Sequence, residues 1–281
     1  MFGSKKSANS VKGRTVVITG AGSGIGQALA LQMAAKGANL ALADINAANL
    51  DATRKKAAHP GVMIKTYTLD VSDKDAVYQF AEQVNKDFGR VDVVINNAGV
   101  ALSETVEDMN YDDFKWVMDI NFWGVVYGTK AFLPFLKQSD QAFIVNISSI
   151  FGLISLPTQS AYNASKFAVR GFTEALRVEL EGTTVTPVCV HPGGIKTNIA
   201  KSARFYKGMD GSLDLSDAIS HFDRHARTTP AQAAKTIING IESSNRRVLV
   251  GFDAYVVDWV QRLMPVSYSD IMQKLLSQKI F

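Results

Sequence analysis

The chain has 281 residues, of which 47% are hydrophobic and 20% are charged, and this suits one large core without a second domain. Its formal net charge of +4 is spread without a basic motif or stripe, which argues against nucleic-acid binding. A single cysteine excludes an intrachain disulfide, and no apolar stretch approaches the ~20 residues of a membrane span, so we expect a cytoplasmic protein.

Residues 1–12 are expected to form a flexible lead to one folded domain over residues 13–251. The lead contains Lys5, Lys6 and Lys12, but no apolar run follows these charges. It therefore lacks the pattern of a signal peptide.

The domain begins with a strand, a glycine-rich loop and a helix. Residues 14–19 form a short apolar run, and residues 20–26 read Gly-Ala-Gly-Ser-Gly-Ile-Gly before a helical apolar pattern. Glycines let the main chain approach a ligand closely, and a helix N-terminus offers free N–H groups to a pyrophosphate. The pattern predicts a dinucleotide site.

A second apolar strand, 38–43, is followed by Asp44. A carboxylate at this point can accept hydrogen bonds from a ribose 2′-hydroxyl and repels a 2′-phosphate. Neither Ser23 nor Ile45 is replaced by a cation that would bind the phosphate, so we expect NAD rather than NADP. The alternative is that Asp44 caps the helix that follows.

Further strands alternate with helical patterns along the rest of the domain. They are expected at 62–69, 91–95, 142–148, 185–190 and 247–251. Several are nearly continuous runs of Val, Ile and Leu, as expected for strands covered on both faces. The sequence predicts an α/β fold with a doubly wound parallel sheet of about seven strands.

A helix is expected after Pro157, ending near Gly182, and it places Tyr162 and Lys166 four residues apart on one face. A lysine close to a phenol stabilises the phenolate, so we expect the pKa of Tyr162 to fall from ~10 toward ~7. The alternative is an ordinary aromatic and cation pair on a surface helix. A core-facing stripe is expected at spacings of three or four, formed by Ala161, Ala164, Ala168, Phe172, Ala175 and Leu176.

Residues 194–229 lack a clear strand pattern and are long for a connection. Such a segment is typical of a lid that covers a substrate site. His221 and His225 lie in it, but no carboxylate or cysteine set completes a metal site, so no metal is expected. His191 precedes this segment, and its sequence context assigns it no role.

Residues 252–281 are expected to form an amphipathic helical extension. Its first helix carries an apolar stripe at Phe252, Tyr255, Val256, Trp259, Val260, Leu263 and Met264, and a second stripe at Tyr268, Ile271, Met272, Leu275 and Leu276. Packing on the same subunit, covering the substrate pocket and assembly with another copy are all open. Membrane-surface contact is a weaker alternative, because the polar faces carry aspartates and lack basic enrichment.

Taken in order, these motifs resemble those of the short-chain dehydrogenase/reductase family over residues 12–251. Residues 19–26 resemble its cofactor loop, Asn96-Asn97-Ala98-Gly99 its NNAG segment, and residues 192–197 the segment that binds the nicotinamide carboxamide. The resemblance implies a catalytic tetrad of Asn121, Ser149, Tyr162 and Lys166. It implies cofactor contacts from Gly20, Ser23, Gly24, Ile25, Gly26, Asp44, Asp70, Val71, Asn97, Ala98, Gly99, Tyr162, Lys166, Pro192, Gly193, Ile195 and Thr197.

The family's mechanism implies a role for each member of the tetrad. Tyr162 would exchange a proton with the substrate oxygen, and Ser149, thirteen residues before it, would hold that oxygen. Lys166 would bind the nicotinamide ribose and lower the phenol's pKa, and Asn121 would hold a water in a proton relay. A homodimer or homotetramer is expected by the same analogy.

The expected substrate is a secondary alcohol or ketone on an apolar skeleton. Apolar residues are expected around the reacting atoms, at Val100, Leu102, Ile150, Phe151, Leu153, Leu156 and Ile195. About half of these side chains can instead belong to the core. Two other functions stay open: an NADPH-dependent reductase of carrier-bound ketones, and an NAD-sensing interaction protein without turnover.

Overall fold

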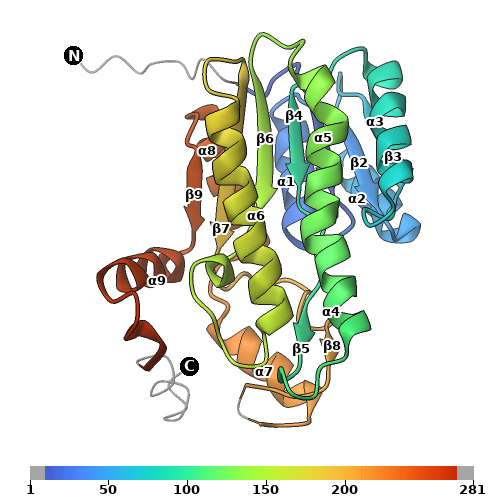
Figure 1. Ribbon diagram of the computed structural model, residues 1–281. Helices are drawn as coiled ribbons and strands as arrows, with labels where there is room; N and C mark the ends of the chain where they lie inside the picture. The colour runs from blue at the N-terminus through green and yellow to red at the C-terminus, as the bar shows by residue number, and fades with distance from the viewer. Residues whose placement is uncertain (1–9, 210, 271–281) are drawn as a thin grey trace, which may run out of the picture.

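A seven-stranded parallel sheet forms the centre of the protein (Figure 1). The computed structural model describes residues 10–209 and 211–270. The strands of this sheet are β1 (Thr15–Thr19), β2 (Asn39–Asp44), β3 (Ile64–Thr68), β4 (Val93–Asn96), β6 (Ala142–Ile147), β7 (Val185–Pro192) and β9 (Arg247–Val250). Their order is β3-β2-β1-β4-β6-β7-β9. The order reverses between β1 and β4, which is where a crevice for a ligand opens in sheets of this kind.

Helices cover both faces of the sheet (Figure 1). One face carries α1 (Gly24–Ala35), α2 (Ala47–Ala57) and α8 (Pro230–Glu242), and the other carries α3 (Lys74–Phe88), α5 (Gly124–Leu136) and α6 (Ser160–Glu179). Side chains alternate between the two cores along each strand: Val16 and Ile18 enter one core and Val17 the other. Because both faces are covered, the central strands β1, β4 and β6 are largely apolar and buried, whereas the edge strand β3 is partly exposed and carries Lys65 and two threonines.

Several shorter elements lie at the carboxyl ends of the strands. They are α4 (Tyr111–Met118), a π-helix (Asp119–Trp123), a 3₁₀ turn (Ile150–Gly152), α7 (Leu215–His225), and the strand pair β5 (Leu102–Ser103) and β8 (Arg204–Phe205). The chain then continues into α9 (Phe252–Leu263). These elements surround the end of the sheet at which a ligand would bind.

The predicted doubly wound sheet is confirmed, and each of the seven predicted strands lies within two residues of an observed one. The sequence did not reveal β5 and β8, because two-residue strands carry no periodic pattern. Their pairing connects the chain after the NNAG segment to the expected lid at 194–229. That segment also contains α7, and its function as a lid stays a prediction.

The predicted core stripe of α6 is wrong in part. Ala164 and Ala175 are exposed, whereas the side of the helix facing the sheet buries Ser165, Lys166, Val169, Thr173 and Leu176. The polar members of this set are hydrogen-bonded: Thr173 Oγ1 donates to Val169 O at 2.6 Å, and Lys166 Nζ donates to Ile147 O at 3.0 Å. A pattern that counts only apolar residues does not detect a buried face of satisfied polar groups.

The apolar stripe of α9 faces away from the sheet. Phe252, Tyr255, Trp259 and Leu263 are exposed, while Ala254 and Asp258 are the buried residues of this helix. Most of the second predicted stripe, from Ile271 onward, lies outside the described residues. The described part of the extension therefore has an apolar face that is not covered by any of the residues that the structure describes.

Candidate active site

The loop between β1 and α1 brings the main chain into close contact with its neighbours. Gly20 has φ of +64°, and a Cβ there would lie 2.8 Å from Cα of Ala98. A Cβ on Gly26 would overlap the carbonyl oxygen of Gly20. Gly24 begins α1 with φ of +53°, and Ile25 packs against the core. These positions of the loop therefore favour glycine over any residue with a Cβ.

The N-terminus of α1 is available to an anion. Ser23 is its N-cap in an extended conformation, and its side chain makes no capping hydrogen bond. The first-turn N–H groups of a helix are left without intrahelical partners, so they can bind a pyrophosphate. These residues fit a dinucleotide cofactor.

Asp44, the last residue of β2, lies directly beside the glycine loop. Its Oδ2 accepts a hydrogen bond from Gly22 N at 2.8 Å, and its Oδ1 accepts one from Asn46 N at 2.9 Å. The alternative that Asp44 caps α2 is wrong, because Asn46 is the N-cap and accepts from Asn49 N at 3.0 Å. Asp44 thus lies at the carboxyl end of β2 against the glycine loop, and its contact with an adenosine ribose stays a prediction.

The NNAG segment follows β4 and packs on the same loop. Asn97 Nδ2 donates to Thr19 O at 2.9 Å and to Gly20 O at 3.2 Å. Thr19 Oγ1 in turn accepts from the main-chain N–H groups of Asn97 (3.0 Å) and Ala98 (3.2 Å). The sequence analysis included Thr19 in the segment that resembles the cofactor loop but did not predict these hydrogen bonds, since a threonine at the end of a strand has no distinctive signal.

Asp70 and Val71 follow the carboxyl end of β3, at the same end of the sheet as the glycine loop. Asp70 is exposed, and its Oδ1 accepts from Ser72 N at 2.9 Å and from Ser72 Oγ at 2.7 Å. Val71 is buried under Gly124, where a Cβ would lie 2.9 Å from its Cγ2.

Ser149, Tyr162 and Lys166 come together at the carboxyl end of β6. The Ser149 hydroxyl lies close enough to the phenol of Tyr162 to lower its pKa, and Lys166 Nζ lies 5.5 Å from the centroid of the Tyr162 ring. Ser148 does not join them, because its Oγ donates to Lys166 O at 2.8 Å. The i and i+4 spacing on α6 therefore does place the amine beside the phenol.

Gly99 and Asn121 border the same group. A Cβ on Gly99 would lie 3.1 Å from Asn121 Oδ1 and 3.5 Å from Lys166 Nζ. Asn121 lies in the π-helix, an element that is frequent at functional sites. Its side chain donates to Val100 O (2.9 Å) and Ser165 Oγ (3.1 Å) and accepts from Val100 N (2.8 Å). With both amide hydrogens engaged, only one acceptor position of this side chain remains for the expected water.

Burial controls the protonation of both titratable groups. It raises the pKa of Tyr162 to about 12, although the nearby Ser149 hydroxyl acts in the opposite direction. It lowers the pKa of Lys166 to about 8. The expected fall of the phenol's pKa toward 7 is therefore not produced by the chain itself, because desolvation disfavours the phenolate and the ammonium alike.

Residues 192–197 close the site on the side of the glycine loop. Pro192 ends β7, and Gly193 N donates to Val250 O at 2.9 Å. Ile195 is buried, and Thr197 Cγ2 lies 3.2 Å from the position of a Cβ on Gly24. The segment thus runs from the end of β7 to a position beside the start of α1.

Sequence reasoning missed one contact to this segment. The carboxylate of Asp253, in the first turn of α9, accepts a hydrogen bond from Gly194 N at 2.6 Å. The two residues are 59 positions apart, so no local pattern links them.

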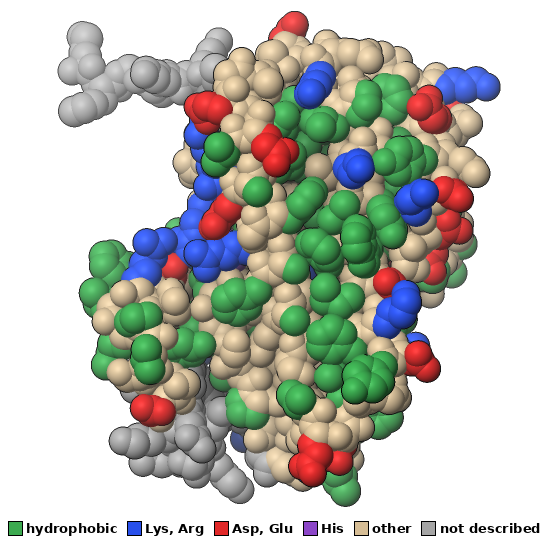
Figure 2. All heavy atoms as spheres, in the orientation of Figure 1, with side chains coloured by type: hydrophobic (Ala, Val, Ile, Leu, Met, Phe, Trp, Pro, Cys, Tyr) green, Lys and Arg blue, Asp and Glu red, His purple; other side chains and the backbone are tan. Residues whose placement is uncertain are grey.

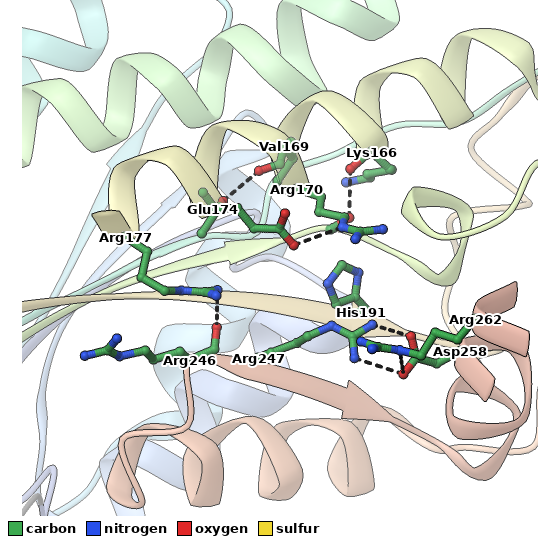
Figure 3. Close-up of polar contacts among 12 residues, drawn as sticks. Lys166, Val169, Arg170, Glu174, Arg177, His191, Arg246, Arg247, Asp258 and Arg262 are labelled. Atoms are coloured by element: carbon green, nitrogen blue, oxygen red, sulfur yellow. Dashed lines mark hydrogen bonds and ion pairs between the residues drawn. The ribbon is translucent and has the colours of Figure 1, made fainter. Parts of the chain in front are cut away.

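His191 is completely buried next to Ser149. Its Nδ1 lies 3.1 Å from the main-chain oxygen of Ser149, and because a carbonyl only accepts, Nδ1 carries the proton. Its Nε2 has no hydrogen-bond partner among the described residues. Burial lowers the pKa of His191 to about 4. The hydrogen bond to the main chain of Ser149 acts in the opposite direction, while Arg247 and Arg170 lower the pKa further and Glu174 raises it, each by a smaller amount (Figure 3).

Because the pKa of His191 is lowered in the folded protein, we expect the fold to lose stability in acid. A folded-state pKa of about 4 against ~6.5 in the unfolded chain means that its neutral form stabilises the fold fully above pH ~6.5. The contribution is lost as the pH falls to about 4, and it amounts to about 3 kcal/mol. Urea unfolding at pH 7 and pH 4.5 should show a smaller decrease for His191→Asn than for the wild-type chain. Equal decreases would contradict this assignment.

The apolar residues expected around the reacting atoms divide into two groups. Leu102, Leu153 and Ile195 are buried in the protein, whereas Val100, Ile150, Phe151 and Leu156 are half-buried. The Phe151 ring packs edge-on against Tyr162 at 6.0 Å between centroids. Phe151 can therefore contact a substrate at the phenol.

Two other kinds of site are not found in the parts of the chain that the structure describes. No group of three or more His, Cys, Asp or Glu side chains there could hold a metal ion. Within the same residues, no helix combines the length and apolarity needed to cross a lipid bilayer. Nothing is described of the side chains of His221 and His225, so the expectation for them stays a prediction.

Known proteins resemble this chain in sequence and in fold. Residues 14–206 match the family model for short chain dehydrogenase. The chain is 47% identical over 267 residues to a Mycobacterium tuberculosis protein named "Putative oxidoreductase SadH", covering 94% of this chain and 95% of that protein.

Two solved structures bear out the fold. A short-chain dehydrogenase/reductase from Burkholderia phymatum in complex with NAD has a TM-score of 0.82 and 28% identity, and the match covers 94% of this chain and 96% of the other. A short-chain dehydrogenase from Mycobacterium paratuberculosis bound to NAD has a TM-score of 0.73 and 26% identity, covering 86% of this chain and 97% of the other.

Proposed function

Because this chain belongs to the short-chain dehydrogenase family, we propose that it transfers a hydride between NAD(H) and a secondary alcohol or ketone on an apolar skeleton. One observation carries the proposal: the Ser149 hydroxyl, the Tyr162 phenol and the Lys166 amine lie together, with the amine 5.5 Å from the centroid of the phenol ring. An acid–base group, a second hydroxyl donor and an amine are thus aligned along one edge of the crevice. This arrangement suits proton exchange with a substrate oxygen.

The bound nicotinamide supplies or accepts the hydride, and the protein supplies position and protons. The glycine loop and the N-terminus of α1 would hold the pyrophosphate, and Asp44 the adenosine ribose. Lys166, whose amine lies beside Gly99, would bind the nicotinamide ribose. Ile195 and Thr197 would lie along the nicotinamide, since their segment reaches the start of α1.

Tyr162 would give its proton to the substrate oxygen during reduction and take it back during oxidation. Ser149 would hold that oxygen through its hydroxyl. Burial makes the phenolate costly, which suits a group that gives up a proton only when another charge compensates. Lys166 provides such a charge when it is protonated, and its pKa of about 8 keeps both of its forms accessible near neutral pH.

NAD is the preferred cofactor in this proposal. Asp44 directs its carboxylate into the glycine loop, where a 2′-phosphate would meet a like charge. No lysine or arginine lies at Ser23 or Ile45 to compensate. This argues against the NADPH-dependent alternative.

The proposed substrate is apolar around its reacting carbon. Phe151 packs against the phenol, and Val100, Ile150 and Leu156 are likewise half-buried and uncharged. An acidic substrate would find no cation on these side chains to replace its hydration.

A screen of secondary alcohols tests this proposal. Purified protein with NAD and aliphatic, alicyclic or steroid-like alcohols should produce NADH, followed by its absorbance, at rates well above those with charged hydroxy acids. Faster turnover of a hydroxy acid than of every apolar alcohol would contradict the substrate class. Binding of NADH without turnover of any compound would favour the sensor alternative.

We propose further that the protein forms a homodimer or homotetramer in the cytoplasm. Exposed apolar or small residues on α6 follow one stripe at Ala164, Phe167, Gly171, Ala175 and Val178, and Figure 2 shows hydrophobic side chains gathered over this face. Such a stripe suits burial against a second copy. The single cysteine of the protein, Cys189, is buried, which fits a reducing compartment.

A further inference from the structure

The segment that follows β7 is held by main-chain partners on two sides. Gly193 N donates to Val250 O at 2.9 Å, Thr228 N donates to Gly194 O at 3.2 Å, and Lys196 N donates to Thr228 O at 2.9 Å. The two bonds with Thr228 connect both ends of the 194–229 segment to each other. They leave the N–H of Gly194 to be satisfied by another group.

A side chain from the C-terminal extension satisfies it. Asp253 Oδ2 accepts from Gly194 N at 2.6 Å, and a hydrogen bond to an ionised acceptor is about twice as strong as a neutral one. Asp253 lies in the first turn of α9, where the helix dipole favours a negative charge. The carboxylate is therefore stabilised at this position by the helix as well as by its partner.

Two glycines provide the space for this carboxylate. A Cβ on Gly193 or on Gly251 would overlap an Asp253 oxygen, and Gly251 has φ of +95°. The side chain thus lies directly against the main chain at both positions. Contact this close transmits any displacement of Asp253 to the Gly193–Gly194 peptide.

The segment that begins at Gly194 extends to the cofactor loop. From Gly194 the chain passes through Ile195, which is bridged to Thr228, to Thr197 beside Gly24. A displacement at Gly194 would therefore move the residues that border the start of α1.

α9 is attached to the sheet at a second point. Asp258 is bonded to Arg247 of β9 at 3.0 and 2.5 Å and to Arg262 at 3.1 Å (Figure 3). This ion cluster anchors the helix without contacting residues 193–197. The two aspartates of α9 therefore separate two effects: attachment of the helix, and contact with the cofactor segment.

We propose that Asp253 is a positioning residue for the nicotinamide cofactor. Through Gly194, the C-terminal helix holds residues 194–197 in the conformation that binds NAD(H). The inference rests on the proposed function, because it assumes that this chain binds NAD(H). It assigns the start of the extension a task in the cofactor site.

The test compares NADH binding by the wild-type chain, Asp253→Ala, Asp253→Asn and Asp258→Ala, measured by the fluorescence of bound NADH. Asp253→Ala should raise the Kd for NADH at least about tenfold, because a charge-assisted hydrogen bond is lost. Asp253→Asn keeps an acceptor oxygen and should raise it by only about threefold. Asp258→Ala should lower the thermal midpoint while changing the Kd less than about twofold.

The outcomes separate the inference from the proposed function. An unchanged Kd in Asp253→Ala, with normal binding by the wild-type chain, would overturn the inference alone. Equal weakening in Asp258→Ala would also overturn it, because helix attachment would then explain the effect. A wild-type chain that does not bind NADH would overturn both. If Asp253→Ala fails to fold, the Asn variant decides: a Kd equal to that of the wild type would overturn the inference, and a rise of about threefold would support it.

Discussion

Replacing Tyr162 with phenylalanine is expected to lower kcat by about 100- to 10,000-fold, the range typical for loss of a general acid or base. The substitution removes the hydroxyl of α6 that lies beside Ser149 and next to the Lys166 amine. The ring itself remains, so its edge-on contact with Phe151 is kept. The measurement is NADH formation at saturating alcohol and NAD.

Tyr111→Phe is the matched control, because Tyr111 is 91% exposed at the start of α4. It removes the same hydroxyl from a surface position and should leave kcat unchanged. The Kd of NADH should also change little in Tyr162→Phe, since the glycine loop and Asp44 are untouched. A Tyr162→Phe variant that retains most of its turnover would remove Tyr162 from the proposed mechanism.

Replacing Asp44 with asparagine is expected to raise the ratio of NADPH to NADH affinity by about 10- to 100-fold. Asparagine keeps an acceptor for the N–H of Gly22 but loses the charge that repels a 2′-phosphate and strengthens the bond to a ribose hydroxyl. The measurement is the Kd of each cofactor in the wild-type and variant chains.

Asp51→Asn serves as the control for this change. Asp51 is paired with Arg54 and Lys55 on the surface of α2 and does not touch the glycine loop. Its removal should leave the cofactor ratio as it is. Tighter binding of NADPH than of NADH by the wild-type chain would contradict the assignment of NAD and favour the NADPH-dependent alternative.

The sheet could be predicted because its strands carry their own signal. Each is a short run of apolar residues between turn-forming segments, and burial on both faces requires such runs. The glycine loop was equally clear, since φ values of +64° at Gly20 and +53° at Gly24 require residues without a Cβ. These features depend on the local chain and not on distant partners.

Other elements carry no such local signal. The β5–β8 pair joins segments about a hundred residues apart through two residues each, and neither segment is periodic. The buried side of α6 was misplaced because Ser165, Lys166 and Thr173 are polar, and their burial is tolerated only where partners from other elements satisfy them. The contact between Asp253 and Gly194 depends in the same way on the path of the chain between them.

By itself, the sequence determined the α/β class, the strand positions, the cofactor loop and the order of the residues that resemble a catalytic tetrad. Only the tertiary structure decided which of their groups touch, and in what state they are held. Burial is a property of the assembled protein, so the pKa of about 12 for Tyr162 and about 8 for Lys166 has no counterpart in residue spacing. Spacing along α6 brings the phenol and the amine together, but the surrounding core sets the free energy of charging each of them.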